Sequence, residues 1–141
     1  MYFIQIKYPD TTLLQRFIDE AGVSLQSFRY FKTRPLEVIK NHACTFLLMD
    51  DTHIPVAYGH LDKENETIWL GIVVTEAYIG CGYGVMMMRQ LIDFAKENNI
   101  PTIKLSVDNS NKSAIKLYEK LGFVLLEKKE TLSFYSLSVK N

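Results

Sequence analysis

Residues 67–98 read TIWLGIVVTEAYIGCGYGVMMMRQLIDFAKEN, and three patterns follow one another within them. The first eight residues are almost entirely apolar, which is typical of a central strand covered on both faces of a sheet. Glycines then crowd residues 80–84, and a helix is expected over roughly Gly84–Asn98. Met87 and Leu91 belong to a broad apolar stripe at helical spacing, which should face the core. The stretch therefore predicts a strand, a glycine-rich turn and a half-buried helix.

Apolar periodicity and turn residues predict further elements on both sides of this stretch. Strands are expected over residues 2–7, 43–49, 55–61, 102–107, 123–127 and 131–139. Helical segments are expected from Thr11 or Thr12 to Gly22, and over residues 25–31, 36–40 and 113–121. Residues 64–66 should turn the chain, so that the strands before and after them form a hairpin. Because no linker or internal repeat interrupts the chain, residues 1–141 are expected to form a single α/β domain.

Composition excludes two classes of protein. The chain has 16 Lys+Arg and 16 Asp+Glu, so its formal net charge is zero, and 48% of its residues are hydrophobic. Intrinsic disorder requires low hydrophobicity and high net charge, and neither is present. A module that binds nucleic acid usually carries a basic excess, so no nucleic-acid partner is expected.

The chain has no pattern that would send it into or across a membrane. Its first residues, MYFIQIKYPD, lack an apolar segment after a basic start, so no signal peptide is predicted. The longest charge-free run, Ala77–Met88, is too short to span a bilayer. Cys44 and Cys81 are expected to be free thiols in a reduced, cytoplasmic protein with no membrane partner.

The glycine-rich loop has two interpretations. Closely spaced glycines allow several backbone N–H groups to turn toward one concavity, and the following helix adds its positive dipole end, so the loop can cradle a phosphate. The dinucleotide pattern fails because Val85 occupies its last glycine position, and the P-loop pattern fails because no Lys follows Gly84. The other interpretation is that the glycines only make a tight turn.

A second motif lies at residues 111–123, NKSAIKLYEKLGF. Ala114, Leu117, Tyr118 and Leu121 are spaced i, i+3, i+4 and i+7, so Tyr118 should lie on the inward face of a helix. Taken alone, a tyrosine in such a stripe is usually a core residue.

Together the two motifs resemble those of the GNAT superfamily of acyl-CoA-dependent N-acetyltransferases. The family's loop, V-x-P-x-x-(R/Q)-G-x-G-(I/Y)-G, corresponds here to residues 74–84. Its later motif, N-x-x-A-x-x-L-Y-x-x-x-G-F, is matched from Asn111 to Phe123. Ile79 replaces the usual Arg or Gln, and Glu76 replaces the usual Pro. The loop therefore lacks one basic contact to a phosphate but keeps its backbone donors.

The resemblance implies a mixed, largely antiparallel, twisted sheet of about six to seven strands flanked by helices. The central strand, residues 67–74, should splay from its neighbour at a bulge and open a slot for acetyl-CoA. The main chain of that strand should pair with the pantetheine arm, and the loop amides should hold the pyrophosphate. The cofactor-binding residues implied are Ile72, Val73, Val74, Gly80, Cys81, Gly82, Tyr83, Gly84, Asn111 and Tyr118.

The resemblance also implies direct attack of an amine on the acetyl thioester, with Tyr118 as the general acid that reprotonates the CoA thiolate. The N–H of Val74 is expected to polarise the thioester carbonyl. His60 is the first candidate for the general base, and Glu76, Asp108 or a water chain are alternatives. The three histidines lack metal-ligand spacing, so no metal is expected.

The acceptor is expected to be a small-molecule amine such as an amino sugar, bound near Arg29, Tyr30 and Trp69. An amine of a protein is an alternative acceptor, and a non-catalytic acyl-CoA-binding or regulatory domain is an alternative function. The aromatic and basic side chains at residues 28–34 are equally compatible with ordinary packing. The chain is expected to be a monomer or a homodimer.

Overall fold

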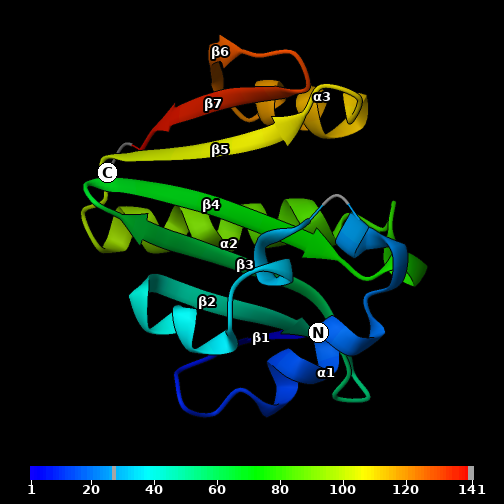
Figure 1. The fold of residues 1–141 in the computed structure, drawn as a ribbon. Helices are drawn as coiled ribbons and strands as arrows, with labels where there is room; N and C mark the ends of the chain where they lie inside the picture. The colour runs from blue at the N-terminus through cyan, green and yellow to red at the C-terminus, as the bar shows by residue number, and fades with distance from the viewer. Residues whose placement is uncertain (27, 140–141) are drawn as a thin grey trace.

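A computed structural model describes residues 1–26 and 28–139. Within them, seven strands form one sheet in the order β1-β2-β3-β4-β5-β7-β6 (Figure 1). Every neighbouring pair is antiparallel except β4 and β5, which are parallel. The strands are β1 Tyr2–Gln5, β2 His42–Met49, β3 Pro55–Glu64, β4 Thr67–Val74, β5 Thr102–Asp108, β6 Val124–Lys128 and β7 Leu132–Ser138. The expected class and the largely antiparallel sheet are confirmed.

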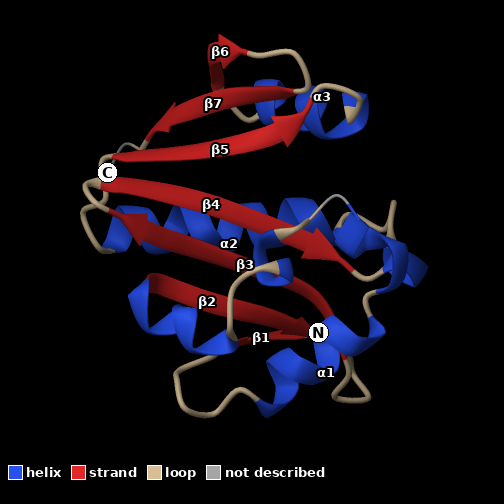
Figure 2. Cartoon of the chain, viewed as in Figure 1, coloured by secondary structure: helices blue, strands red, loops and turns tan. Residues whose placement is uncertain are grey.

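Helices cover both faces of the sheet (Figure 2). The α-helices are α1 Thr12–Glu20, α2 Tyr83–Glu97 and α3 Lys112–Lys120. Short 3₁₀ helices occupy η1 Gly22–Gln26, η2 Tyr30–Lys32, η3 Leu36–Asn41 and η4 Glu76–Tyr78. We call the side on which α2 packs the α2 face, and the side covered by α1, η1, η2 and η3 the α1 face.

The α2 face holds the larger core. Met87, Met88 and Leu91 of α2 are fully buried against the central strands, as their spacing predicts. Burying one such side chain contributes about 1.5–3 kcal/mol to folding. A side chain at Gly59 of β3 would place its Cβ 2.5 Å from Cγ of Met87. The helix therefore approaches the sheet closely at a position where only glycine leaves room.

A smaller core on the α1 face joins α1 to the same strands. Leu14 and Phe17 of α1 are buried against Leu47, Tyr58 and Val73. Tyr58, His60 and Asp62 of β3 thus point to the α1 face, since alternate residues of a strand share a face. This face carries most of the polar chemistry described below.

The helix expected over residues 25–31 is wrong as one continuous α-helix, because the chain forms η1 and η2 there; Ser27 lies outside the described residues. The rings of Phe28 and Phe31 lie 5.6 Å from that of Tyr58, and Tyr30 lies 4.4 Å from His60. An α-helix would place Phe28 and Tyr30 on opposite sides. Packing both rings against β3 therefore requires the chain to unwind.

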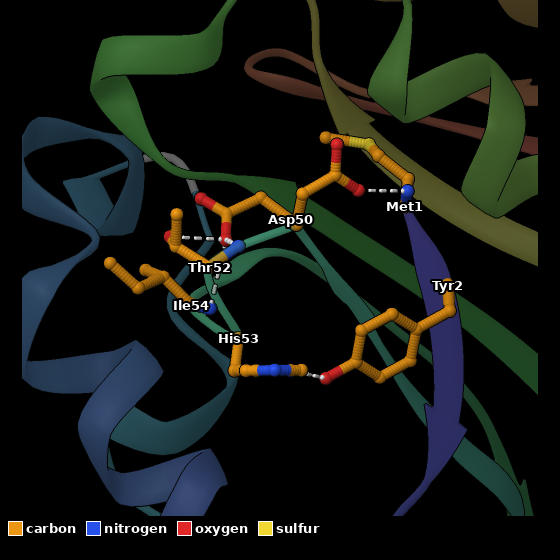
Figure 3. A network of polar contacts seen from close by, with 7 residues as sticks. Met1, Tyr2, Asp50, Thr52, His53 and Ile54 are labelled. Carbon is orange, nitrogen blue, oxygen red and sulfur yellow. Dashed lines mark hydrogen bonds and ion pairs between the residues drawn. The ribbon is translucent and has the colours of Figure 1, made fainter.

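A polar network joins the start of β1 to the turn between β2 and β3 (Figure 3). The amino group of Met1 binds Oδ1 of Asp51 at 2.7 Å, and the hydroxyl of Tyr2 lies 2.6 Å from Nδ1 of His53. Oδ1 of Asp50 accepts bonds from Thr52 and from the N–H of Ile54. These contacts fix the β2–β3 turn against β1.

Candidate functional site

The parallel strands β4 and β5 separate along their length. Among the described residues the register between them has one pair, Trp69 with Lys104. Figure 1 shows the two strands diverging toward their C-terminal ends. The bulge expected in β4 is wrong, because its pairing with β3 is continuous from Ala57–Val74 to Glu64–Thr67. Pairing with β3 keeps β4 regular, so the divergence falls entirely on the β5 side.

Backbone groups of β4 face this divergence at alternate residues. The N–H of Thr75 bonds to the carbonyl of Val56 on β3 at 3.0 Å. Because the direction of backbone groups alternates along a strand, Val73 also turns its N–H and C=O toward β3, while Ile72 and Val74 turn theirs toward β5. Beyond Trp69, Ile72 and Val74 therefore present main-chain groups to the space between the strands. Of the three residues whose main chain is predicted to pair with the pantetheine arm, Ile72 and Val74 turn their N–H and C=O groups toward β5, and Val73 does not.

The loop after β4 is shaped for close approach of a ligand. Gly80 and Gly82 have φ of +86° and +85°, a region that residues with a side chain rarely adopt. A Cβ at either position would meet nothing within 4 Å. Conformation, not crowding by the protein, therefore requires glycine here, and the space beside the backbone is open.

The loop ends at the N-terminus of α2, where backbone donors remain free. The first helical bond runs from the N–H of Met86 to the carbonyl of Gly82, and no side chain caps the helix. The N–H groups of Tyr83, Gly84 and Val85 therefore lack helical acceptors. Val85 was not among the residues predicted from sequence. Cys81, which was, already donates its N–H to the carbonyl of Tyr78 at 3.3 Å.

Tyr118 lies on the inward side of α3, as predicted. Its ring centroid is 5.8 Å from that of Phe123, and it packs against the core of the α2 face. Burial raises the pKa of its phenol, so the hydroxyl keeps its proton at neutral pH. Asn111 caps α3 by accepting the N–H of Ala114 at 3.3 Å. The side-chain oxygen of Asn111 thus already has a structural role.

A buried polar chain lies on the α1 face. Tyr30 donates its hydroxyl proton to Oδ2 of Asp62 at 2.7 Å, so its oxygen accepts from Nε2 of His42, also at 2.7 Å. Nδ1 of His42 then accepts from the hydroxyl of Thr45 at 2.7 Å. Burial lowers the pKa of His42 to about 4, and burial and Asp62 raise that of Tyr30. Asp62 is therefore the one negative charge in this chain of four groups.

His60 is deeply buried beside this chain. It is 2% exposed, and its Nδ1 lies 2.5 Å from the hydroxyl of Tyr58. A Cβ at Gly71 would lie 2.5 Å from Nε2 of His60 and 3.0 Å from the ring of Phe28. Burial lowers the pKa of His60 well below its usual range. His60 is thus a buried neutral imidazole, packed among the rings of Phe28, Tyr30, His42 and Tyr58.

The segment carrying Phe28 crosses the α1 face, and hydrogen bonds hold it near the ends of β4 and β5. Glu76, after β4, accepts the N–H of Val23 at 3.2 Å. Arg29 binds Oδ1 of Asp108, at the end of β5, with its Nη2 at 3.0 Å. Figure 1 shows this part of the chain in front of β4.

The side chains predicted to contact the acceptor differ in their surroundings. Arg29 is half-exposed in its ion pair. The hydroxyl of Tyr30 is committed to Asp62, and its ring lies 4.4 Å from Cζ of Arg34. Trp69 faces the same side as His60 and lies 6.1 Å from the ring of Phe134 on β7. The structure thus gathers Arg29 and Tyr30 in one segment and leaves Trp69 on the neighbouring strand.

Two buried hydroxyls at this end of β4 were missed from the sequence. Oγ of Ser24 and Oγ1 of Thr75 are buried and have no hydrogen-bond partner among the described residues. Buried polar atoms usually have partners, so these two are available to a ligand or a water molecule. No local pattern marks Ser24, because its place depends on η1 folding back over β4.

Residues 1–26 and 28–139 contain neither a cluster of metal ligands nor a membrane-spanning helix. No three His, Cys, Asp or Glu side chains of this part gather closely enough to hold a metal ion. None of its helices is long and apolar enough to cross a membrane. Cys44, which is buried, and Cys81, which is exposed, are both free thiols, as expected.

Comparison with known proteins gives a family match. The model of the acetyltransferase (GNAT) family matches residues 11–123. A curated relative, the [ribosomal protein bS18]-alanine N-acetyltransferase of Haemophilus influenzae, is 41% identical over 59 residues. That alignment covers 42% of this chain and 40% of the relative, so it spans less than half of either protein.

Solved structures with the same fold match nearly the whole chain. The ribosomal-protein-S18-alanine N-acetyltransferase of Escherichia coli superposes with a TM-score of 0.76 at 20% identity, covering 99% of this chain and 94% of that one. A Salmonella typhimurium protein considered an acetyltransferase, solved with its cofactor acetyl-CoA, gives a TM-score of 0.78 at 16% identity, covering 100% and 95%. At these identities the likeness concerns the fold alone.

Proposed function

This chain belongs to the acetyltransferase (GNAT) family, and from that premise we propose that it transfers the acetyl group of acetyl-CoA to a primary amine. The observation that carries the proposal is the alignment of three features at the C-terminal end of β4. They are the free main chain of Ile72 and Val74, the open glycine loop, and the unpaired N–H groups that begin α2. An extended arm and a pyrophosphate need these two kinds of donor.

The residues present suit acetyl-CoA without a basic side chain in the loop. Tyr83, Gly84 and Val85 would hold the pyrophosphate with their N–H groups and the positive end of the helix dipole. Ile72 and Val74 would pair with the pantetheine arm as one strand pairs with another. When bound, acetyl-CoA supplies an acetyl group activated as a thioester.

Two groups of the chain then carry the chemistry. The N–H of Val74 points into the divergence and would stabilise the negative charge that develops on the thioester oxygen. Tyr118 would donate its proton to the departing thiolate, which its raised pKa allows because the phenol stays protonated. The amine attacks directly in its neutral form and gives up one N–H proton to a base, for which His60, Glu76, Asp108 or a water chain are the candidates, so no covalent enzyme intermediate is required.

The acceptor is proposed to be a small-molecule amine. The ring of Phe28 covers β4 on the α1 face and fills the space beside Gly71. A small amine fits such a covered site better than a folded protein surface does. A protein amine is the second candidate, because the Haemophilus influenzae relative is named for an alanine of a ribosomal protein.

Neutral charge supports the absence of a nucleic-acid partner. With 16 basic and 16 acidic residues, the chain lacks the field that a nucleic-acid partner would select. We propose that it acts in the cytoplasm as a monomer or homodimer, without a metal.

The test is thiol release from acetyl-CoA with a panel of amino sugars, polyamines, amino acids and peptides with free N-termini. Turnover with at least one amine, lost when the amine is omitted, is the expected result. A small amine as the best acceptor supports the first candidate, and a peptide supports the second. Silence of the whole panel, or failure of acetyl-CoA to raise the melting temperature, would overturn the proposal, because a ligand selective for the folded state must stabilise it.

A further inference from the structure

We propose that Asp108 binds the ammonium group of the acceptor, and that Arg29 occupies this position until the acceptor displaces it. The inference rests on the proposed function and extends it to the recognition of the acceptor.

Asp108 lies beside the reaction site on the α1 face. It is the last residue of β5, beyond the pair Trp69–Lys104 where β4 and β5 part. Ile103, Leu105 and Val107 face the core on the α2 side, so the side chain of Asp108 faces the opposite side. The segment that carries Phe28 lies on the same side. Val74, at the end of β4, lies on the opposite side of the space between β4 and β5.

The partner of Asp108 is a cation that an amine can replace. Arg29 comes from a segment 79 residues away, and its guanidinium contacts Oδ1 of Asp108 at 3.0 Å. The two side chains are 49% and 25% exposed. An exposed ion pair of this kind contributes about 0–1 kcal/mol, so exchange for another cation costs little. A substrate ammonium presents the same charge and the same N–H donors.

Two other carboxylates on this side are already engaged. Asp62 is 4% exposed and accepts the hydroxyl proton of Tyr30. Glu76 accepts the N–H of Val23 and holds η1 in place. Asp108 is thus the acid among these three whose partner is a half-exposed cation.

The kinetic test uses the best acceptor from the panel above and three single variants. Asp108→Asn should raise the KM for the amine severalfold, since an ion pair of this exposure contributes up to about 1 kcal/mol. Arg29→Ala should lower that KM, because it removes the competing cation. Arg16→Ala breaks an exposed ion pair with Glu20 on α1 and should leave this KM unchanged. All three should keep the Kd for acetyl-CoA.

The direction of the Arg29 effect separates this proposal from a structural role. If the ion pair only holds the segment in place, Asp108→Asn and Arg29→Ala break the same contact and both raise the KM. That result would overturn the proposal.

A second test needs no turnover. Titration with n-butylammonium should shift the Nε–H nuclear magnetic resonance signal of Arg29 in the wild type and leave it unmoved in Asp108→Asn. Tetramethylammonium, which has no N–H donor, is the control for charge and ionic strength. If butylammonium acts no differently from this control, Asp108 does not bind ammonium groups, whatever the amine panel shows. A silent panel with a positive titration would instead mean that the proposed function, not the ammonium site, is wrong.

Discussion

At the scale of single residues, Tyr118 carries the clearest catalytic prediction. Tyr118→Phe removes the one atom that can donate a proton and keeps the ring that packs near Phe123. We expect kcat to fall about 100-fold or more while the Kd for acetyl-CoA stays within a factor of a few. Steady-state kinetics with the best acceptor and calorimetric titration with acetyl-CoA measure the two quantities.

Tyr135→Phe is the matched control for this variant. Tyr135 is also a buried tyrosine next to α3, and its hydroxyl bonds to Oε2 of Glu119 at 3.3 Å. Loss of this hydroxyl should affect stability and leave kcat nearly unchanged. Equal kcat for both variants and the wild type would exclude Tyr118 as the acid.

Gly84 tests whether the loop serves a ligand or only the turn. A Cβ at Gly84 would meet Cγ2 of Val74 at 3.7 Å, an ordinary contact, so Gly84→Ala should keep or raise stability by up to about 1 kcal/mol. The added methyl group would stand where the pyrophosphate approaches the N–H groups. We therefore expect the Kd for acetyl-CoA to rise about 10-fold, by loss of roughly one charge-assisted hydrogen bond.

Thermal unfolding and calorimetric titration of the same sample separate these two effects. Arg89→Ala, exposed on the same helix, should change neither by much. An unchanged Kd in Gly84→Ala would favour the interpretation in which the glycines only make a tight turn.

At the scale of elements, Gly71 sets the fit between β4, β3 and the segment that covers them. A Cβ there would lie 2.5 Å from Nε2 of His60, whose ring is held by Tyr58 and covered by Phe28. Gly71→Ala should therefore lower the free energy of unfolding by about 1–3 kcal/mol, the usual range for overpacking. Urea denaturation measures the loss.

A double-mutant cycle assigns the cause of this loss. His60→Ala removes the ring that the new methyl group would strike, so Gly71→Ala should cost much less in that background. If the two losses simply add, contact with His60 is not the reason that position 71 is a glycine.

The elements also show which features local sequence can predict. The strand at residues 67–74, the glycine turn and the helix from Tyr83 were predicted correctly, because hydrophobic period and glycine placement depend on near neighbours. The continuous helix at residues 25–31 was not, since Phe28 and Tyr30 contact strand residues about 30 positions away. The Arg29–Asp108 pair depends on tertiary geometry in the same way. The free N–H of Val85 follows instead from the start of α2 at Tyr83, one residue before the predicted start.

The whole molecule has a formal net charge of zero. In two parts of the structure, neutral groups occupy positions where positive charges could be expected. The loop that would meet phosphates has backbone donors in place of basic side chains, and Ile79 is 61% exposed where the family usually has Arg or Gln. On the α1 face, buried His42 and His60 are both held neutral. This second arrangement makes the stability of the protein depend on pH.

The sign of that dependence follows from the two histidines. Burial lowers the pKa of His42 from 6.5 to about 4, and it lowers that of His60 well below its usual range. The unfolded chain therefore binds more protons than the folded one between about pH 6.5 and 4, and stability must fall as the pH falls through this window. For His42 alone, the loss between pH 7 and pH 5 is roughly 2 kcal/mol.

Urea denaturation at pH 7, 6 and 5 tests this dependence above the range in which carboxylates titrate. His42 faces Thr45, Tyr30 and Asp62, and His42→Gln can retain polar contacts while losing the titration. We expect this variant to be less stable at pH 7 but to lose clearly less stability than the wild type on acidification. A wild-type protein equally stable at pH 7 and pH 5 would show that the buried histidines do not titrate as their burial requires.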